Sequence, residues 1–127
     1  MRRTKFRGSR SSAWTIVEPV THRERMRGAR DARWLTSTHG MLFESCRSVH
    51  TFGMREPITV AALDRQLRVV RTLVLRPRRL LLPRPGVRHM LECRADADVR
   101  TGDRFFREAQ PERRRGEGPT TLRPMRR

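Results

Sequence analysis

The sequence predicts a mainly β protein, a small antiparallel sandwich or barrel with one short N-terminal helix and disordered basic termini. The chain has 127 residues, which is enough for a single domain with short tails. From Gly40 onward its apolar residues recur with a period of two, as they do in strands that are buried on one face. Short polar or Gly/Pro breaks separate these runs without helical stretches between them, which favours antiparallel strands.

The charge and apolar patterns divide the chain into three parts. Residues 1–13 carry five basic and no acidic side chains, and residues 107–127 carry seven basic and three acidic ones. Neither segment has a periodic apolar pattern, so we predict that both are disordered basic arms. Residues 14–106 hold nearly all the large apolar side chains and are predicted to form the β domain.

The domain is expected to begin with one strand and one helix. Residues Trp14–Glu18 are aromatic and β-branched and end at Pro19, which suits a short strand. Thr21 and Glu24 then fit a capping box, in which each side chain accepts a hydrogen bond from the other residue's backbone N–H. A short helix is therefore predicted over residues 22–33.

The later strands are predicted at runs rich in β-branched, aromatic and aliphatic residues, namely 41–43, 49–52, 58–63, 69–75 and 87–93. Thr101–Asp103 has the composition of a turn, and Phe105 is expected to close the last strand. Residues 80–86 are predicted to form a loop despite their three leucines, because Pro83 and Pro85 cannot donate to a strand ladder.

The segment from Cys46 to Asp64, CRSVHTFGMREPITVAALD, resembles the signature of the domain of unknown function 192 family, in the form common in GC-rich bacteria. The similarity extends over residues 14–106. It implies a compact, mainly β domain with one small helix, and it implies no established activity, substrate or cofactor.

The chain departs from the pattern of that family at four places. Glu56 stands where members usually have Phe, Thr59 where they usually have Asp, and Ala62 where Phe is common. Their hairpin usually turns on Asp-Gly, whereas this chain has Gln66-Leu67, and Leu resists the positive φ that Gly supplies. Two bulky aromatics are missing, so we expect a less stable copy in which any polar role of the usual Asp is absent or altered.

Cys46, His50 and Met54 are four residues apart and would share one face of a strand. Their thiolate, imidazole and thioether groups suit copper. Four residues of strand span about 13 Å, which is too far for ligands of one ion unless Gly53 bends the chain. We interpret the three as lining the core or a pocket, and we predict no metal site.

His50 and the late aspartates each have a functional and a structural interpretation. His50 is a proton-transfer group at a cleft or, as we favour, an imidazole that is hydrogen-bonded at the sheet surface. Asp96, Asp98 and Asp103 are carboxylates for acid–base or cation chemistry or, as we favour, parts of a solvated turn. The sequence has no phosphate-binding Gly loop, Ser elbow or His-Glu-x-x-His motif, so we expect neither enzyme activity nor a cofactor.

The preferred interpretation is a binding or accessory module without catalysis, whose partner is a small ligand or another protein. Its site is predicted on a shallow concave face near His50, Met54, Pro57 and Thr59. The alternative is a polyanion binder that contacts RNA or DNA through its arginines, Arg76, Arg78, Arg79, Arg113, Arg114 and Arg115.

The net charge does not choose between these two interpretations. The chain has 30 basic and 13 acidic residues, which gives +17, and all but one of the basic residues are arginine. Tyr and Asn are absent. This bias fits a GC-rich coding strand at least as well as selection for basicity, and the few aromatics are not interleaved with arginine as in a stacking platform.

The sequence also bears on location. No apolar run approaches the roughly 20 residues of a membrane span, and no apolar signal-peptide core follows the basic N-terminus. The arms have no apolar face for a membrane-surface helix. We therefore expect a cytoplasmic protein without membrane contact, in which Cys46 and Cys93 are reduced and mostly buried.

Overall fold

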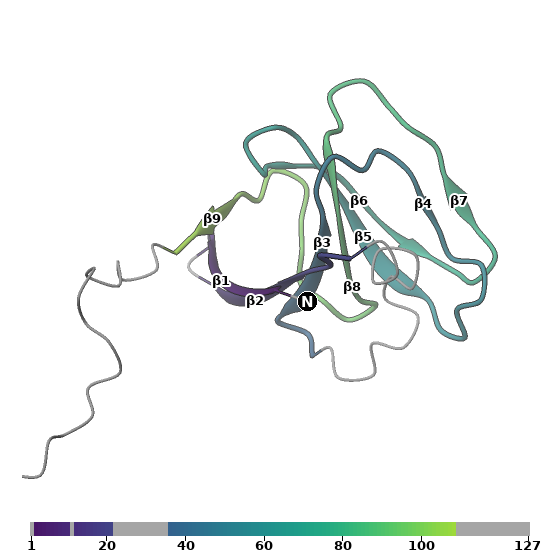
Figure 1. The fold of residues 1–127 in the computed structure, drawn as a ribbon, viewed down its shortest axis with the longest axis horizontal. Helices are drawn as coiled ribbons and strands as arrows, with labels where there is room; N and C mark the ends of the chain where they lie inside the picture. Colours follow the sequence, from purple (N-terminus) through teal and green to yellow (C-terminus); the bar gives the residue numbers. More distant parts are fainter. Residues whose placement is uncertain (1, 11, 22–35, 109–127) are drawn as a thin grey trace, which may run out of the picture.

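The computed structural model describes residues 2–10, 12–21 and 36–108. These residues contain no helix, and the helix predicted over 22–33 lies outside them. They form nine strands (Figure 1): β1 Arg2–Gly8, β2 Ala13–Glu18, β3 His39–Phe43, β4 Val49–His50, β5 Ile58–Leu63, β6 Val69–Leu75, β7 Leu80–Leu81, β8 His89–Arg94 and β9 Phe105–Arg107. A helix long and apolar enough to cross a membrane is not found in this part of the chain.

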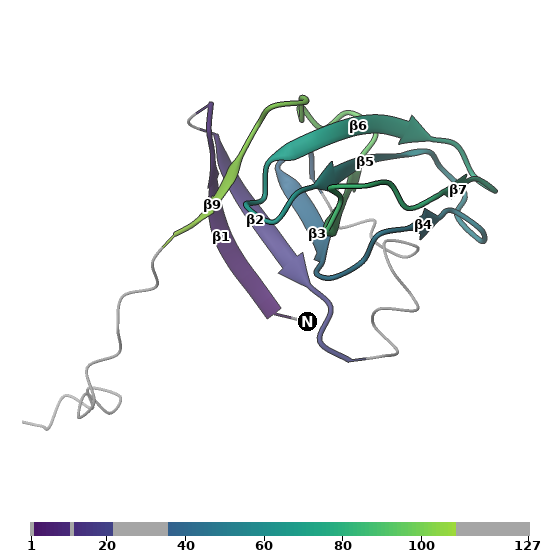
Figure 2. The same cartoon turned by 90° about the horizontal axis from the view of Figure 1, so that it is seen from above.

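Seven of the strands form one curled sheet, and β4 and β7 form a separate two-stranded ribbon (Figures 1 and 2). The order in the sheet is β6-β5-β8-β3-β2-β1-β9. All neighbours are antiparallel except β2 and β3, which are parallel. Residues 19–38 separate β2 from β3, which is long enough for the crossover that a parallel pair requires. The antiparallel sandwich or barrel that the sequence predicts is therefore corrected to a mixed, half-barrel sheet.

Apolar side chains cover both faces of the sheet. On one face the two ends of the sheet approach each other, where the backbone N–H of Phe105 donates to the carbonyl of Leu67. Trp14 meets Phe105 edge-on there, with ring centroids 5.4 Å apart. The opposite face packs against the β4–β7 ribbon. We call that second cluster the ribbon core; it contains Met41, Phe43, Val49, Ile58, Val60, Ala62, Leu75, Leu81, Val87 and Met90.

Residues 2–8 form a strand, which corrects the prediction of a disordered arm over residues 1–13. β1 pairs with β2 on one side and with β9 on the other. Its inward positions Thr4, Phe6 and Gly8 are buried, whereas most of its outward positions carry basic side chains. In the sequence, the basic outward residues of β1 alternate with inward residues that belong to the core, so the segment resembles a basic tail.

β9 ends at Arg107, which the sequence places at the start of the disordered tail. The rest of that predicted tail, from residue 109, lies outside the described residues. Arg107 ion-pairs with Glu18 at 2.7 Å, and Arg2 reaches the same carboxylate at 2.6 Å. Glu18 is buried, so this three-residue contact ties the two outer strands to β2.

Most of the other predicted strands are confirmed, two of them with the same bounds (58–63 and 69–75). The strand expected over 49–52 is shorter, because only Val49–His50 pairs. The loop predicted over 80–86 contains β7, which is a correction. Leu80–Leu81 can pair with β4 because the first proline comes two residues after Leu81, beyond the paired segment.

The β5–β6 hairpin shows the backbone strain expected at Gln66-Leu67. Leu67 has a φ of 60°, in the left-handed region that favours glycine. The Asp64 carboxylate accepts hydrogen bonds of 2.9 Å from the backbone N–H groups of Gln66 and Arg68, which holds the turn closed. The Leu67 side chain also packs against the core, so burial offsets part of the strain.

Candidate functional site

The residues predicted to form a binding face lie in different environments. His50 is exposed on the outer face of the ribbon, with its ring centroid 5.6 Å from that of Phe52. Met54 packs against the ribbon core, and Pro57 is exposed just before β5. Thr59 is buried and donates to the carbonyl of Ala95 at 3.1 Å. Its neighbours Ile58 and Val60 point to the opposite face of the sheet, so the four predicted residues do not share one surface.

The thiol, imidazole and thioether of Cys46, His50 and Met54 do not converge either. Cys46 Sγ donates to the carbonyl of Ser48 at 3.1 Å, and Cys46 and Met54 pack against the ribbon core while His50 faces outward. Within the described ranges, no three His, Cys, Asp or Glu side chains are grouped to hold a metal ion. Cys93 is buried, and its burial raises the pKa of the thiol.

Arg10 joins two of the three late aspartates into a structural contact. Its guanidinium donates to Asp98 at 3.0 Å and to Asp103 at 2.9 Å. The hydrogen bond from Arg10 lowers the pKa of Asp98. Burial raises the pKa of Asp103, but the hydrogen bonds from Arg10 and from the backbone N–H of Arg100, together with the charge of Arg10, more than compensate and lower it. Asp96 pairs with Arg94 instead. These carboxylates are therefore charged partners of arginines that hold the 96–103 loop.

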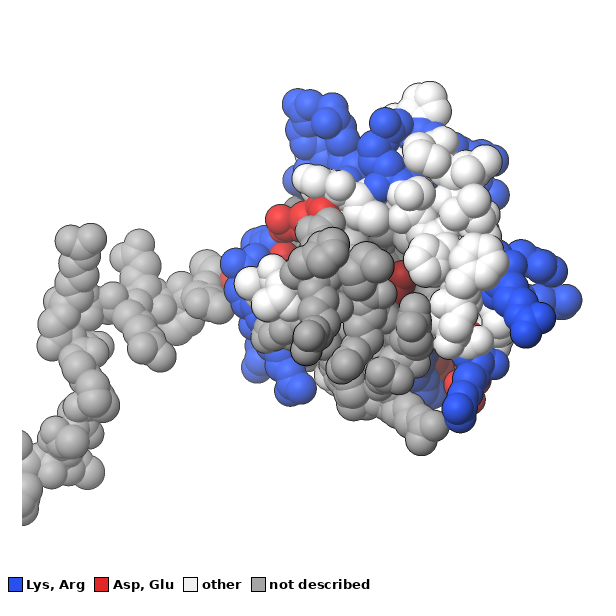
Figure 3. Space-filling model, turned by 45° about the vertical axis from the view of Figure 1, so that its right-hand side comes forward, with Lys and Arg blue, Asp and Glu red and all other residues white. Residues whose placement is uncertain are grey.

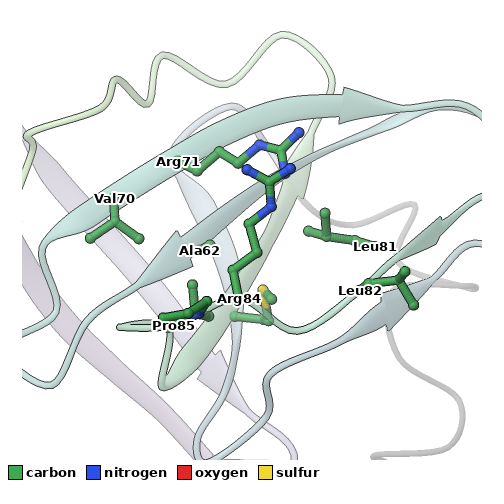
Figure 4. A pocket seen from close by; sticks show the side chains of 9 residues that line it. Ala62, Val70, Arg71, Leu81, Leu82, Arg84 and Pro85 are labelled. Carbon is green, nitrogen blue, oxygen red and sulfur yellow. The ribbon is translucent and has the colours of Figure 1, made fainter.

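A cavity of about 420 Å³ opens on the ribbon-core face above Ala62 (Figure 4). Ala62 stands opposite Arg71 of β6 and Met90 of β8 in the sheet register, so the three side chains form one row on the same face. Because alanine is the shortest of the three, the row is hollow at its centre. The ribbon and the segment after it supply the facing wall, through Leu81, Leu82, Arg84, Pro85 and Val87.

Two backbone features shape the mouth of this cavity. The register of β5 and β6 shifts next to Ala62, so Val70 is an extra, unpaired residue in a β-bulge. Across the mouth, the Arg47 guanidinium donates to the carbonyls of Arg84 at 3.1 Å and Val87 at 3.2 Å. The wall that carries Arg84 is therefore fixed to the loop before β4 as well as to the sheet.

The cavity combines an apolar interior with two arginines. Figure 4 shows the side chains of Arg71 and Arg84 extending from opposite walls to the same part of the mouth. Among the described residues, neither guanidinium has a carboxylate partner. Two like charges that share an apolar opening repel each other until an anion lies between them. The arrangement therefore favours a ligand with an apolar body and a negatively charged end.

The lining contains no group suited to acid–base or nucleophilic chemistry. Its nine residues are seven apolar side chains and the two arginines, without a carboxylate, imidazole, thiol or hydroxyl. Arginine remains protonated at ordinary pH and serves as a binding group for carboxylates and phosphates. The charged groups of this lining are therefore suited to binding an anion.

Sequence analysis did not find this cavity, although one of its signals is present. Ala62 is among the positions at which the chain departs from the resembled family, but the sequence could indicate only a missing aromatic. Arg71 and Arg84 come from strands and loops that meet only in the folded chain, so spacing alone could not pair them.

The basic segment 76–79 is held in a fixed turn. Thr51 is completely buried, and its hydroxyl donates to the carbonyl of Arg76 at 2.6 Å and accepts from the backbone N–H of Arg79 at 2.8 Å. Arg78 has a φ of 62° and donates its backbone N–H to the carbonyl of Thr51. The side chains of Arg76, Arg78 and Arg79 are exposed, and the predicted contacts at residues 113–115 lie outside the described residues.

Comparisons with known proteins give a family and two similar folds. The family model DUF192, described as uncharacterized ACR, matches residues 5–105. A candidate transcription regulator from Sinorhizobium meliloti is 19% identical, with a TM-score of 0.67 over 83% of this chain and 92% of that one. A protein of unknown function from Novosphingobium aromaticivorans is 15% identical, with a TM-score of 0.59 over 82% of this chain and 83% of that one. Curated proteins give no match. At these identities the two structures show the fold alone.

Proposed function

Because the chain belongs to the DUF192 family of uncharacterised proteins, and no activity comes with that membership, we propose a function from the cavity itself. The protein is a non-catalytic binding module for small molecules that have an apolar body and a carboxylate or another oxyanion at one end. The observation that carries this proposal is the pair Arg71 and Arg84 at the mouth of an otherwise apolar cavity.

The size and composition of the cavity suit such a ligand. Small-molecule sites commonly measure about 300–1,000 Å³ and are mostly apolar with a few polar groups that set orientation. The cavity measures about 420 Å³, so a short aliphatic or single-ring body fits. Arginine binds an oxyanion through two parallel N–H groups, and two arginines can bind one oxyanion from both sides.

This proposal moves the binding site away from the face predicted near His50, Met54, Pro57 and Thr59. The cavity lies on the ribbon-core face, whereas His50 is on the outer side of the ribbon and Thr59 is on the other side of the sheet. The cavity supports the general prediction of a binding module and gives it different residues.

A titration with ligands of equal chain length tests the proposal. We expect octanoate to bind in a calorimetric or NMR titration, and octylammonium and octanol to bind at least tenfold more weakly, because only the carboxylate is attracted by both arginines. Ala62→Phe should abolish binding by filling the cavity, and Arg71→Gln or Arg84→Gln should each weaken it about tenfold. Arg88→Gln is the matched control, because Arg88 is exposed and does not line the cavity. Equal affinity for the three ligands, or octanoate binding that survives Ala62→Phe, would overturn the proposal.

Polyanion binding through Arg76, Arg78, Arg79 and residues 113–115 remains the alternative. The observation that favours it is the fixed turn on Thr51, which presents three exposed arginines together. Binding of RNA or DNA measured at rising salt, with the full chain and with a chain ending at Glu108, tests it. Affinity that disappears at moderate salt for every sequence would reflect charge alone.

A further inference from the structure

The outer face of the β4–β7 ribbon is apolar and unusually exposed. Val49 and Leu81 pair inward, onto the ribbon core, so the next pair, His50 and Leu80, faces outward. Leu80 is 57% exposed, Leu82 is 64% exposed and Phe52 is 53% exposed. We call these three residues, Phe52, Leu80 and Leu82, the ribbon ridge. They account for three of the seven large apolar side chains that are exposed among the described residues.

The ribbon ridge is fixed in place rather than carried on a loose loop. Thr51, directly before Phe52, is the buried anchor of the turn that leads into Leu80. The backbone N–H of Thr51 also donates to the carbonyl of Arg79 at 2.9 Å. The backbone of the ridge is therefore already ordered before it binds a partner, which lowers the entropic cost of binding.

Arginines surround this apolar surface. Residues 46–57 and 76–88, which build the ribbon and its flanks, contain seven arginines and one acidic residue, Glu56. Figure 3, which brings the β4–β7 side forward, shows a broad uncharged surface with Lys and Arg side chains along its upper and right-hand borders. Arg78 and Arg79 come directly before Leu80 in the chain and are exposed. An apolar centre with a positive border complements a surface that is apolar inside and negative at its edge.

Although the sequence led us to expect no membrane contact, we propose that the ribbon ridge docks on the surface of an anionic phospholipid membrane. Leu80, Leu82 and Phe52 enter the interface between headgroups and acyl chains, and Arg78 and Arg79 contact lipid phosphates. Aliphatic side chains make two-thirds of the ridge, and these gain little from nucleic-acid bases, which bind by stacking on aromatic rings. The proposal goes beyond the binding cavity: Leu82 also lines that cavity, but Phe52 and Leu80 do not.

Co-sedimentation of the full chain with lipid vesicles tests this docking. We expect binding to vesicles of phosphatidylcholine mixed with phosphatidylserine, and at least tenfold weaker binding to phosphatidylcholine alone. Phe52→Ser with Leu80→Ser should lower the partition coefficient on anionic vesicles by at least tenfold, because two apolar side chains no longer leave water. The matched control is Val74→Ser. Val74 is 56% exposed on β6, and its neighbours Leu73 and Leu75 pack against the ribbon core, so the side chain of Val74 points to the opposite face of the sheet.

Charge variants separate the ridge from the general positive charge. Arg78→Gln with Arg79→Gln should lower anionic-vesicle binding about 25-fold, at about fivefold for each basic residue near the membrane surface. Arg65→Gln with Arg68→Gln removes the same charge from the distant β5–β6 hairpin and should lower it only a few-fold. Unchanged circular dichroism and unfolding midpoints show that each variant is folded.

Three results would overturn the proposal. The first is equal binding to neutral and anionic vesicles. The second is an equal loss in the ridge variants and their controls. The third is single-stranded RNA that displaces the protein from vesicles and loses affinity in the Phe52→Ser, Leu80→Ser variant, which would make the ridge a nucleic-acid surface.

Discussion

Replacing the buried hydroxyl of Thr51 is expected to destabilise the protein by about 2–4 kcal/mol. The side chain is fully buried, and its Oγ1 makes hydrogen bonds of 2.6 Å to the carbonyl of Arg76 and 2.8 Å from the N–H of Arg79. Thr51→Val keeps the shape of the side chain but leaves both backbone groups without that partner. Each unsatisfied buried polar group costs about 1–3 kcal/mol, and Thr51 Oγ1 is shared between two of them.

Thr51→Ser is the matched control, because it keeps the hydroxyl and removes only a methyl group, at a cost of about 1 kcal/mol. Urea unfolding followed by circular dichroism gives both free energies of unfolding. The valine variant should be the less stable of the two. If Thr51→Val is as stable as Thr51→Ser, the hydroxyl does not hold the 76–79 turn, and the fixed position of the ribbon ridge loses its basis.

Three further predictions concern other parts of the fold. Glu18→Gln should lower the free energy of unfolding in urea by about 2 kcal/mol. Burial raises the pKa of Glu18, but hydrogen bonds from Arg107 and Arg2 more than compensate and lower it. The stabilisation by Glu18 is therefore full above about pH 5 and is lost as the pH falls through the folded-state pKa. If the Glu18→Gln variant loses stability at low pH in the same way as the unchanged protein, Glu18 is not the source of this pH dependence. Phe6→Ala should cost about 3–5 kcal/mol in the same assay if residues 2–8 are a core strand, and almost nothing if they are a disordered arm. Arg78→Gly should raise the thermal midpoint by relieving about 1 kcal/mol of strain at φ 62°, and an unchanged or lower midpoint would show that the turn is not strained there.

The sequence was sufficient where local pattern and tertiary environment agree. The strands over 58–63 and 69–75 have the predicted bounds because both are rich in aliphatic and β-branched residues and Asp64 marks the turn between them. The strain at Leu67 was also predictable, since it follows from one side chain in a short hairpin.

The sequence was insufficient where the environment comes from distant parts of the chain. β1 has one large buried apolar residue, Phe6, and its other side chains read as those of a basic tail. Its burial depends on β9, which lies about a hundred residues away and contributes Arg107 over the Phe6 ring at 5.1 Å. The parallel pairing of β2 with β3 is likewise a property of topology, which periodicity does not encode.

For a similar reason, the predicted binding face and the cavity that we propose as the binding site lie in different parts of the fold. The signature segment drew attention to His50, Met54, Pro57 and Thr59, which are close in sequence but point to different sides of the sheet and ribbon. The cavity instead depends on a row across three strands, Arg71–Ala62–Met90, whose members are remote in sequence.

The structure separates the arginines by their partners, which the net charge alone could not do. Arg10 and Arg107 neutralise carboxylates, and Arg47 satisfies two backbone carbonyls, so these three act as structural links. Arg71 and Arg84 have no such partner among the described residues and meet at one apolar opening. A coding bias can raise the number of arginines, but it does not bring unpaired ones to the mouth of a cavity. The octanoate titration with Arg71→Gln and Arg88→Gln therefore tests the position of the arginines rather than their number. An equal loss of octanoate affinity in both variants would mean that the net charge of +17 reflects composition alone. A loss of affinity confined to Arg71→Gln would mean that part of this charge serves ligand binding.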